Sequence, residues 1–149
     1  MSKVSIIYST VGGNTEMVCK KVSDVLSEAG LEVKMKRVDV SDMNDLALDG
    51  LTILASPTYG QGTVEDHFKP FLKELKKTDI TGKKFAVIGL GNTKYYPEYL
   101  TEAGTILESF LKEKEAEIIY RTLKIGTNPL GILDSLVTKW AKGLAEKIS

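Results

Sequence analysis

The stretch Val4–Thr15, with the sequence VSIIYSTVGGNT, decides the fold class of this chain. Its first part, Val4–Tyr8, is an apolar and β-branched run that is typical of a buried parallel strand. Hydroxyls, two glycines and an amide follow, and then a segment with helical spacing begins. Such a loop favours a bound phosphate, because free backbone N–H groups and the helix dipole both point toward it. No lysine follows the glycines, so we expect a small phosphomonoester that is held rather than cleaved.

Strands and helices alternate along the rest of the chain. Runs typical of strands occur at residues 4–8, 31–38, 51–55, 85–90 and 118–125. Apolar stripes with helical spacing follow four of these runs, and the polar, turn-rich segment Asp39–Asp49 follows the second. The pattern predicts an α/β protein with one domain over residues 1–149. We expect a three-layer α/β/α sandwich around a five-stranded parallel sheet.

Individual residues sharpen the prediction of four helices. Gly30 follows the first apolar stripe and is expected as the C′ residue of that helix. Pro70 implies that the second helix starts late or kinks. Leu136 and Trp140 both lie on the fourth stripe, which predicts that both side chains are in the core.

The composition excludes several classes of function. The 20 Lys and Arg residues balance the 20 Asp and Glu residues, so no strong field would recruit nucleic acid or an anionic membrane. The single cysteine, Cys19, cannot form an internal disulfide or a multi-cysteine metal site, and its place in the first helix predicts a core residue. No apolar run approaches the roughly 20 residues that span a bilayer. We expect a cytoplasmic protein without a metal.

Two further loops are expected to meet the phosphate loop. Ligands of open parallel sheets gather beyond the carboxyl ends of the strands. The loop after the third strand is Ser56–Thr63, and the loop after the fourth is Gly89–Pro97. Both combine glycines, which let the backbone come close to a ligand, with aromatic side chains. The expected ligand therefore has a phosphate at one end and a flat ring at the other.

These three loops resemble those of the flavodoxins of the short-chain type, and the resemblance covers essentially the whole chain. It implies that the cofactor is FMN and that Tyr59 and Tyr95 stack on the two faces of the flavin. The residues that it places at the cofactor are, in the phosphate loop, Ser9, Thr10, Val11, Gly12, Gly13, Asn14 and Thr15; in the second loop, Pro57, Thr58, Tyr59, Gly60, Gln61 and Gly62; and in the third, Leu90, Gly91, Asn92, Tyr95, Tyr96 and Tyr99.

The resemblance implies a low-potential electron carrier rather than an enzyme. FMN takes up electrons on its own ring, so the protein needs no catalytic residue of its own. The expected partners are a flavodoxin reductase-type donor and an acceptor redox enzyme, and we expect a monomer. Glu65, Asp66 and Glu98 are predicted to be contacts for a basic reductase surface. The single histidine, His67, is predicted to be a surface residue without a ligand or base role.

Two alternatives stay open. Val11 and Gly12 stand where flavodoxins carry another hydroxyl, and this loop and the segment Arg121–Ile125 resemble a subgroup of FMN proteins that supports biotin synthase. The second alternative is a small FMN-dependent quinone reductase, which would need a substrate pocket beside the ring that an oligomer could supply.

Overall fold

The computed structural model describes residues 3–59, 63–91, 102–126 and 128–148. Its centre is a parallel sheet with the strand order β2-β1-β3-β5, beyond which the short strands β6 and β7 both pair with β5. The strands are β1 (Lys3–Tyr8), β2 (Glu32–Arg37), β3 (Leu51–Tyr59), β5 (Lys84–Leu90), β6 (Glu117–Ile118) and β7 (Leu123–Ile125). The predicted fifth strand over 118–125 is thus split into two short segments that share one position in the sheet.

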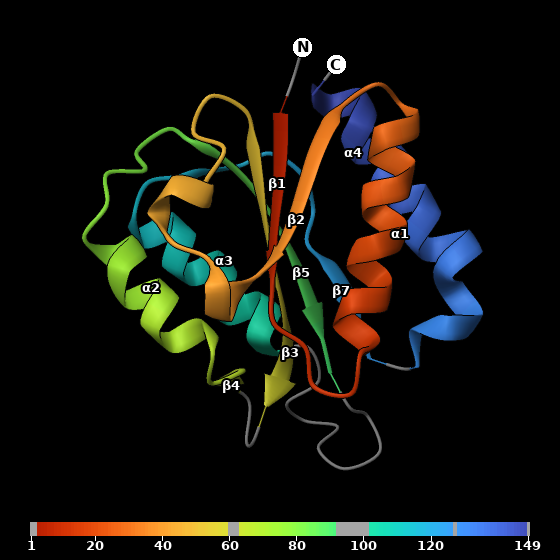
Figure 1. Cartoon of the computed structure of the whole chain (residues 1–149), viewed down its shortest axis with the longest axis horizontal. Coiled ribbons are helices and arrows are strands. Elements are labelled where there is room, and N and C mark those ends of the chain that lie inside the picture. Colours follow the sequence, from red (N-terminus) through yellow and green to blue (C-terminus); the bar gives the residue numbers. More distant parts are fainter. Residues whose placement is uncertain (1–2, 60–62, 92–101, 127, 149) are drawn as a thin grey trace.

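Helices cover both faces of this sheet (Figure 1). On one face lie α1 (Asn14–Glu28) and α4 (Thr138–Ile148), and on the other lie α2 (Phe68–Lys76) and α3 (Glu102–Glu113). The turn-rich segment after β2 forms two 3₁₀ turns, Val38–Val40 and Met43–Asp45. The predicted α/β class and the three-layer α/β/α sandwich are confirmed. Among the described residues, no helix combines the length and apolarity that crossing a membrane requires.

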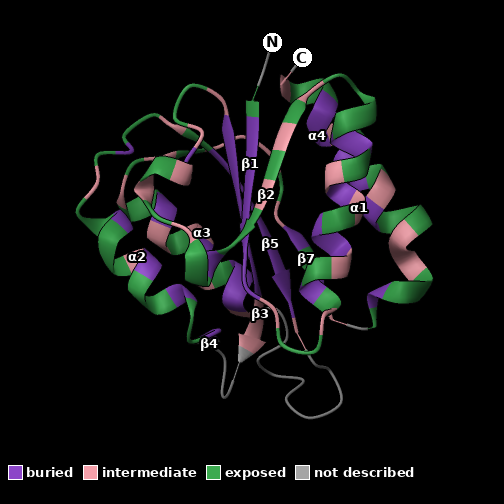
Figure 2. Ribbon diagram, in the orientation of Figure 1, coloured by how far each residue is buried: buried purple, intermediate pink, exposed green. Residues whose placement is uncertain are grey.

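The core lies in two layers, one on each side of the sheet. Figure 2 shows that buried residues dominate β1, β3 and β5. Ile6 and Ile53 pack toward α1 and α4, whereas their chain neighbours Ile7 and Leu54 pack toward α2 and α3. Burial of both faces explains why these strands are mostly apolar rather than alternating. Each such side chain contributes roughly 1.5–3 kcal/mol by leaving water.

Three local predictions meet different outcomes. Gly30 adopts a φ of 92° directly after Ala29, the C-cap residue of α1, which confirms it as the C′ residue. The prediction for Pro70 was wrong, because α2 begins at Phe68 and places the proline in its first turn, where a missing N–H costs no helical hydrogen bond. Leu136 is 43% exposed, while Trp140 is buried. The wider π-helical turn Leu133–Val137 changes the spacing before α4 and turns Leu136 out of the core.

The third strand is longer than predicted. It continues past Ala55 to Tyr59, because the short strand β4 (Thr63–Val64) pairs with it in an antiparallel hairpin. The register pairs Thr58 with Val64 and Tyr59 with Thr63. Pro57 and Thr58, predicted as loop residues, therefore belong to a strand at the carboxyl edge of the sheet.

Candidate functional site

The carboxyl ends of β1, β3 and β5 meet at one edge of the sheet, at the bottom of Figure 1. The register places Tyr8 beside Ala55, and Ala55 beside Ile88. The chain leaves β1 toward β2 and then crosses back to β3, so the direction of winding reverses between β1 and β3. A reversal of this kind opens a crevice for ligands in parallel sheets. The strand ends from which the three loops leave therefore lie at one edge of the sheet, as expected.

The loop Ser9–Gly13 is closed by its own backbone and one hydroxyl. Gly12 and Gly13 have φ values of 79° and 89°, in the left-handed region that favours glycine. The N–H of Gly13 donates to Thr10 Oγ1 at 3.1 Å, and the Gly13 carbonyl accepts the first helical hydrogen bond from Met17 at 3.0 Å. The loop thus turns the chain directly into α1 and leaves the N-terminus of that helix facing the sheet edge.

The hydroxyl of Thr15 is the most informative atom of this loop. Thr15 is 1% exposed, and its Oγ1 has no hydrogen-bond partner within the part of the chain that the structure describes. A buried hydroxyl without a partner costs about 1–3 kcal/mol. The residue lies in the first turn of α1, whose cap residue, Gly13, supplies no side-chain hydrogen bond. An anion at this helix end would satisfy the hydroxyl and the free N–H groups together, so the loop fits a phosphate.

The other predicted loop residues face different surroundings. Asn14 and Val11 are exposed, and Val11 can offer a ligand only its backbone groups. Ser9 is buried, its N–H donates to the Ala55 carbonyl at 3.0 Å, and its Oγ lies 3.4 Å from Ser56 Oγ. The side chain of Ser9 therefore links the phosphate loop to β3.

Tyr8 and Glu16 join the two ends of the loop, a contact that was not predicted from the sequence. The buried Tyr8 hydroxyl donates to Glu16 Oε2 at 2.7 Å, which joins the end of β1 to the first turn of α1. Burial, followed by the hydrogen bond and negative charge of Glu16, raises the pKa of Tyr8 to about 12. The phenol therefore stays a hydrogen-bond donor at neutral pH. A signal existed in the sequence, since the two residues flank the loop at the strand end and the helix start.

The second and third loops are described in part. The Thr58 hydroxyl accepts the Ala103 N–H at 3.1 Å and so holds the start of α3. Leu90 is buried in the core at the end of β5, and the Gly91 N–H donates to the Ile125 carbonyl at 2.8 Å. The register places Pro57 beside Leu90. The residues Gly60, Gln61, Gly62, Asn92, Tyr95, Tyr96 and Tyr99, and the side chain of Tyr59, lie outside what the structure describes, so their cofactor roles stay predictions.

The structure contradicts the prediction that Glu65 is a surface contact. It was expected at the rim as a contact for a reductase, but it is 3% exposed. Its neighbour Asp66 is exposed and pairs with Lys69 at 2.9 Å, and Glu98 lies outside the described residues. The rim prediction for Glu65 was wrong, because its side chain is buried and its carboxyl group contacts the backbone N–H and the ring of His67.

Comparison with known proteins decides the family. The family model described as Flavodoxin matches residues 6–140. The chain belongs to the flavodoxin family. A flavodoxin of Maridesulfovibrio salexigens is 31% identical over 99% of this chain and 100% of that protein. The structure of a flavodoxin from Streptococcus pneumoniae TIGR4 superposes with a TM-score of 0.87 at 26% identity, covering 99% of this chain and 100% of that one. Protein MioC of Escherichia coli O157:H7 is 29% identical over 94% of each chain.

Flavodoxins are electron carriers whose cofactor is FMN, so the predicted family and cofactor are confirmed. The residues present fit this cofactor. The buried Thr15 hydroxyl has no partner among the described residues, and no side chain caps the N-terminus of α1, so both could form hydrogen bonds with an anion such as the FMN phosphate.

Cys19 takes no part in this site and is buried in the core, as predicted. Burial raises the pKa of the Cys19 thiol, and the charge of Glu16 raises it further. We expect the folded protein to resist an aromatic disulfide reagent at pH 8, and the unfolded protein to release one equivalent of thiolate product. Rapid stoichiometric modification of the folded protein would contradict this assignment.

Proposed function

We propose that this chain is a single-domain electron shuttle that carries FMN between a flavodoxin reductase-type donor and an acceptor redox enzyme. The observation that carries the proposal is the buried Thr15 hydroxyl, which has no partner among the described residues and lies at the start of α1, where no side chain caps the helix; together these features support a bound phosphate. Membership of the flavodoxin family supports FMN as the ligand that carries this phosphate. The single buried cysteine suits a reducing compartment, so we place the carrier in the cytoplasm, and we propose separately that it acts as a monomer.

In the proposed mechanism the cofactor carries the electrons and the protein binds and orients the cofactor. FMN, when bound, accepts and releases electrons on its ring. We assign phosphate binding to Thr10, Asn14 and Thr15, and we assign the two faces of the ring to Tyr59 and Tyr95. Stacking of an aromatic pair contributes roughly 0.5–1.5 kcal/mol beyond buried area. It favours the electron-poor oxidised ring, and therefore lowers the potential at which the flavin is reduced.

The Gly60–Gln61 peptide gives a testable consequence. We expect Gly60→Ala to narrow the gap between the two one-electron potentials of the bound flavin. The resemblance to flavodoxins implies that this peptide turns on reduction, and a β-carbon at residue 60 would resist the turn. A potentiometric titration measures both potentials. Gly131→Ala is the matched control, because a Cβ there meets nothing within 4 Å. An equal gap in the parent and Gly60→Ala proteins would refute the assignment.

The carrier function is tested by reconstitution with a flavodoxin reductase and NADPH. We expect the FMN-loaded chain to pass electrons to cytochrome c only when the reductase is present, with a rate that rises with the concentration of the chain. Rapid NADPH oxidation by the chain alone, or direct reduction of a quinone, would replace the carrier with the quinone reductase alternative.

A second, narrower candidate concerns the acceptor. The loop with Val11 and Gly12 and the segment Arg121–Ile125 resemble the subgroup of FMN proteins that supports biotin synthase. In that case the acceptor would be biotin synthase. The test compares biotin formation by that enzyme with this chain and with a general flavodoxin as the electron source, at equal concentrations of reduced flavin.

A further inference from the structure

The hydroxyl of Tyr8 holds a charged side chain at the end of the phosphate loop. Tyr8 ends β1 and is 4% exposed, and its hydroxyl donates to Glu16 Oε2 at 2.7 Å. Glu16 is exposed and lies in the first turn of α1. This contact is the one hydrogen bond that the Glu16 carboxylate makes within the described part of the chain. A neutral phenol, rather than a cation, therefore fixes the position of this negative charge.

The place of Glu16 in the helix offers its carboxylate a second set of partners. Gly13 is the N-cap residue of α1, so Glu16 is the third residue of the helix. A glutamate at this position can turn back and accept a hydrogen bond from an N–H group at the helix start, as in a capping box. The helix dipole also favours a negative charge there. Glu16 is thus able to act as the anion at the start of its own helix.

The structure leaves this helix end open instead. The Gly13 N–H donates to Thr10 Oγ1 at 3.1 Å and not to Glu16, and no side chain caps the helix. The Thr15 hydroxyl, on a residue that is 1% exposed, has no partner among the residues that the structure describes. An open helix end beside such a hydroxyl favours an anion from outside the chain. The hydrogen bond to Tyr8 keeps the carboxylate of Glu16 from taking that place.

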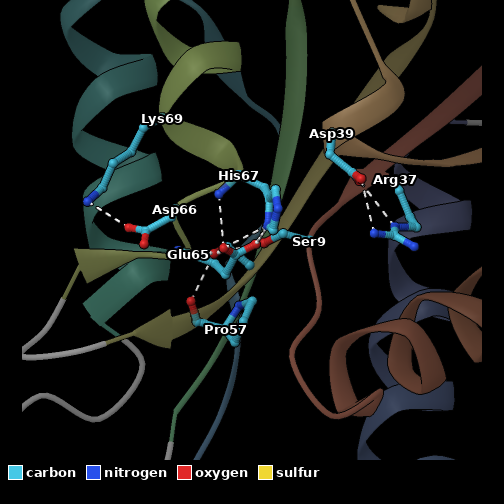
Figure 3. A network of polar contacts seen from close by, with 9 residues as sticks. Ser9, Arg37, Asp39, Pro57, Glu65, Asp66, His67 and Lys69 are labelled. Carbon is cyan, nitrogen blue, oxygen red and sulfur yellow. Dashed lines mark hydrogen bonds and ion pairs between the residues drawn. The ribbon is translucent and has the colours of Figure 1, made fainter.

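A cation near Tyr8 does not hold Glu16 in its stead. Arg37 lies beside Tyr8 in the register of β1 and β2. Its guanidinium donates two hydrogen bonds to the Asp39 carboxylate, at 3.1 and 3.0 Å (Figure 3). Arg37 is therefore bound to another carboxylate, and the Tyr8 hydroxyl is the group that holds Glu16.

We propose that Tyr8 is a positioning residue of the phosphate site. Its hydroxyl keeps the Glu16 carboxylate at the end of β1, which leaves the N-terminus of α1 free for the phosphate of FMN. Loss of the hydroxyl releases Glu16, and the released carboxylate then repels the phosphate and competes with it for the same N–H groups. This role of Tyr8 rests on the proposed FMN site and adds to it a residue that acts through Glu16.

The role of the hydroxyl is tested with Tyr8→Phe, which removes that group alone. We expect the affinity for FMN to fall roughly three- to tenfold, as far as a carboxylate at a helix start can compete. The affinity for riboflavin, which lacks the phosphate, should stay unchanged. Titration of the apoprotein, followed by flavin fluorescence, measures both affinities. The matched control is Tyr120→Phe, which removes a hydroxyl that accepts from Arg121 on a ring packed against Trp140, and it should change neither affinity.

A second substitution separates positioning from packing. Glu16→Gln keeps the size of the side chain and removes its charge. Added to Tyr8→Phe, it is expected to return the FMN affinity to that of the parent protein, because a neutral amide does not repel the phosphate. Glu16→Gln alone should bind FMN no more weakly than the parent. A merely structural role of the Tyr8 hydroxyl would leave the loss of affinity unrescued.

Hydrogen exchange in the apoprotein tests the release of Glu16 without the cofactor. In Tyr8→Phe the released carboxylate is expected to accept hydrogen bonds from the helix start, and therefore to slow exchange of the amides of residues 14–16. Addition of Glu16→Gln should abolish most of this slowing. If the chain bound no FMN, the proposed function would fail, but this comparison would still decide the role of Tyr8.

Four results would each overturn the proposal. The first is an unchanged FMN affinity in Tyr8→Phe, which would follow if Glu16 turned instead to Lys20, one helical turn further along α1. The second is an equal loss of affinity for riboflavin. The third is a loss of FMN affinity that Glu16→Gln does not reverse. The fourth is unchanged exchange of the amides of residues 14–16 in the Tyr8→Phe apoprotein.

Discussion

Thr15→Val is expected to weaken FMN binding by roughly ten- to hundredfold, because it removes a hydrogen bond to a charged phosphate that is worth about 1.5–3 kcal/mol. Valine has nearly the same shape, so the loop keeps its packing. The apoprotein should not lose stability, since the hydroxyl has no partner among the described residues and its burial is a cost. The substitution is thus expected to lower the affinity for FMN without lowering the stability of the apoprotein. Titration of the apoprotein with FMN, followed by flavin fluorescence, gives the affinity, and thermal unfolding gives the stability.

Thr122→Val is the matched control for this experiment. Thr122 Oγ1 is likewise buried without a partner in the described part of the chain, but the residue lies between β6 and β7, short of the strand ends that form the site. Its substitution should leave FMN affinity unchanged. Equal losses of affinity in the two variants, or unchanged affinity in Thr15→Val, would show that the phosphate is held elsewhere.

Gly50→Ala is expected to destabilise the fold at the upper end of the roughly 1–3 kcal/mol range for overpacking. Gly50 lies directly before β3, and a Cβ there would collide with the backbone carbonyl of Lys3 at the start of β1. Because the neighbour is backbone in a paired strand, relief requires the β1–β3 register, Val4 beside Leu51, to give way. Denaturant unfolding of the apoprotein measures the loss.

Gly131→Ala, where a Cβ meets nothing within 4 Å, is the comparison for Gly50→Ala. If the two variants unfolded at the same denaturant concentration, the close approach of Gly50 to Lys3 would be wrong. Gly50 lies at the amino end of β3, opposite the site, so the folded fraction of Gly50→Ala should still bind FMN with the parent affinity.

The layers and the tight turn from β1 into α1 could be predicted from the sequence, because both depend on local signals. The apolar run Val4–Tyr8 specifies a strand buried on both faces, and the paired glycines Gly12 and Gly13 permit the left-handed turns that the loop requires. The resemblance to flavodoxins pointed to Thr15, although the burial of its side chain could not be predicted from the sequence.

The features that were missed depend on contacts between segments distant in the chain or on irregular backbone. The extension of β3 to Tyr59 requires β4 to fold back on it, and two residues are too short a run to be recognised as a strand. Glu65 was predicted at the surface, but its side chain is buried. Its backbone N–H bonds Ser56, and its carboxylate contacts the ring of His67. Leu136 fits a regular helical stripe, but a π-helical turn displaces it.

In the proposed site, the end of β1 and the start of α1 bind the phosphate of FMN. Calorimetric titration of the apoprotein with FMN and, separately, with riboflavin tests it most directly, because the two ligands share the ring and differ in the phosphate. We expect one FMN per chain, much weaker binding of riboflavin, and a smaller difference between the two ligands in Thr15→Val. Binding of riboflavin as tight as that of FMN, or no heat with either, would contradict it.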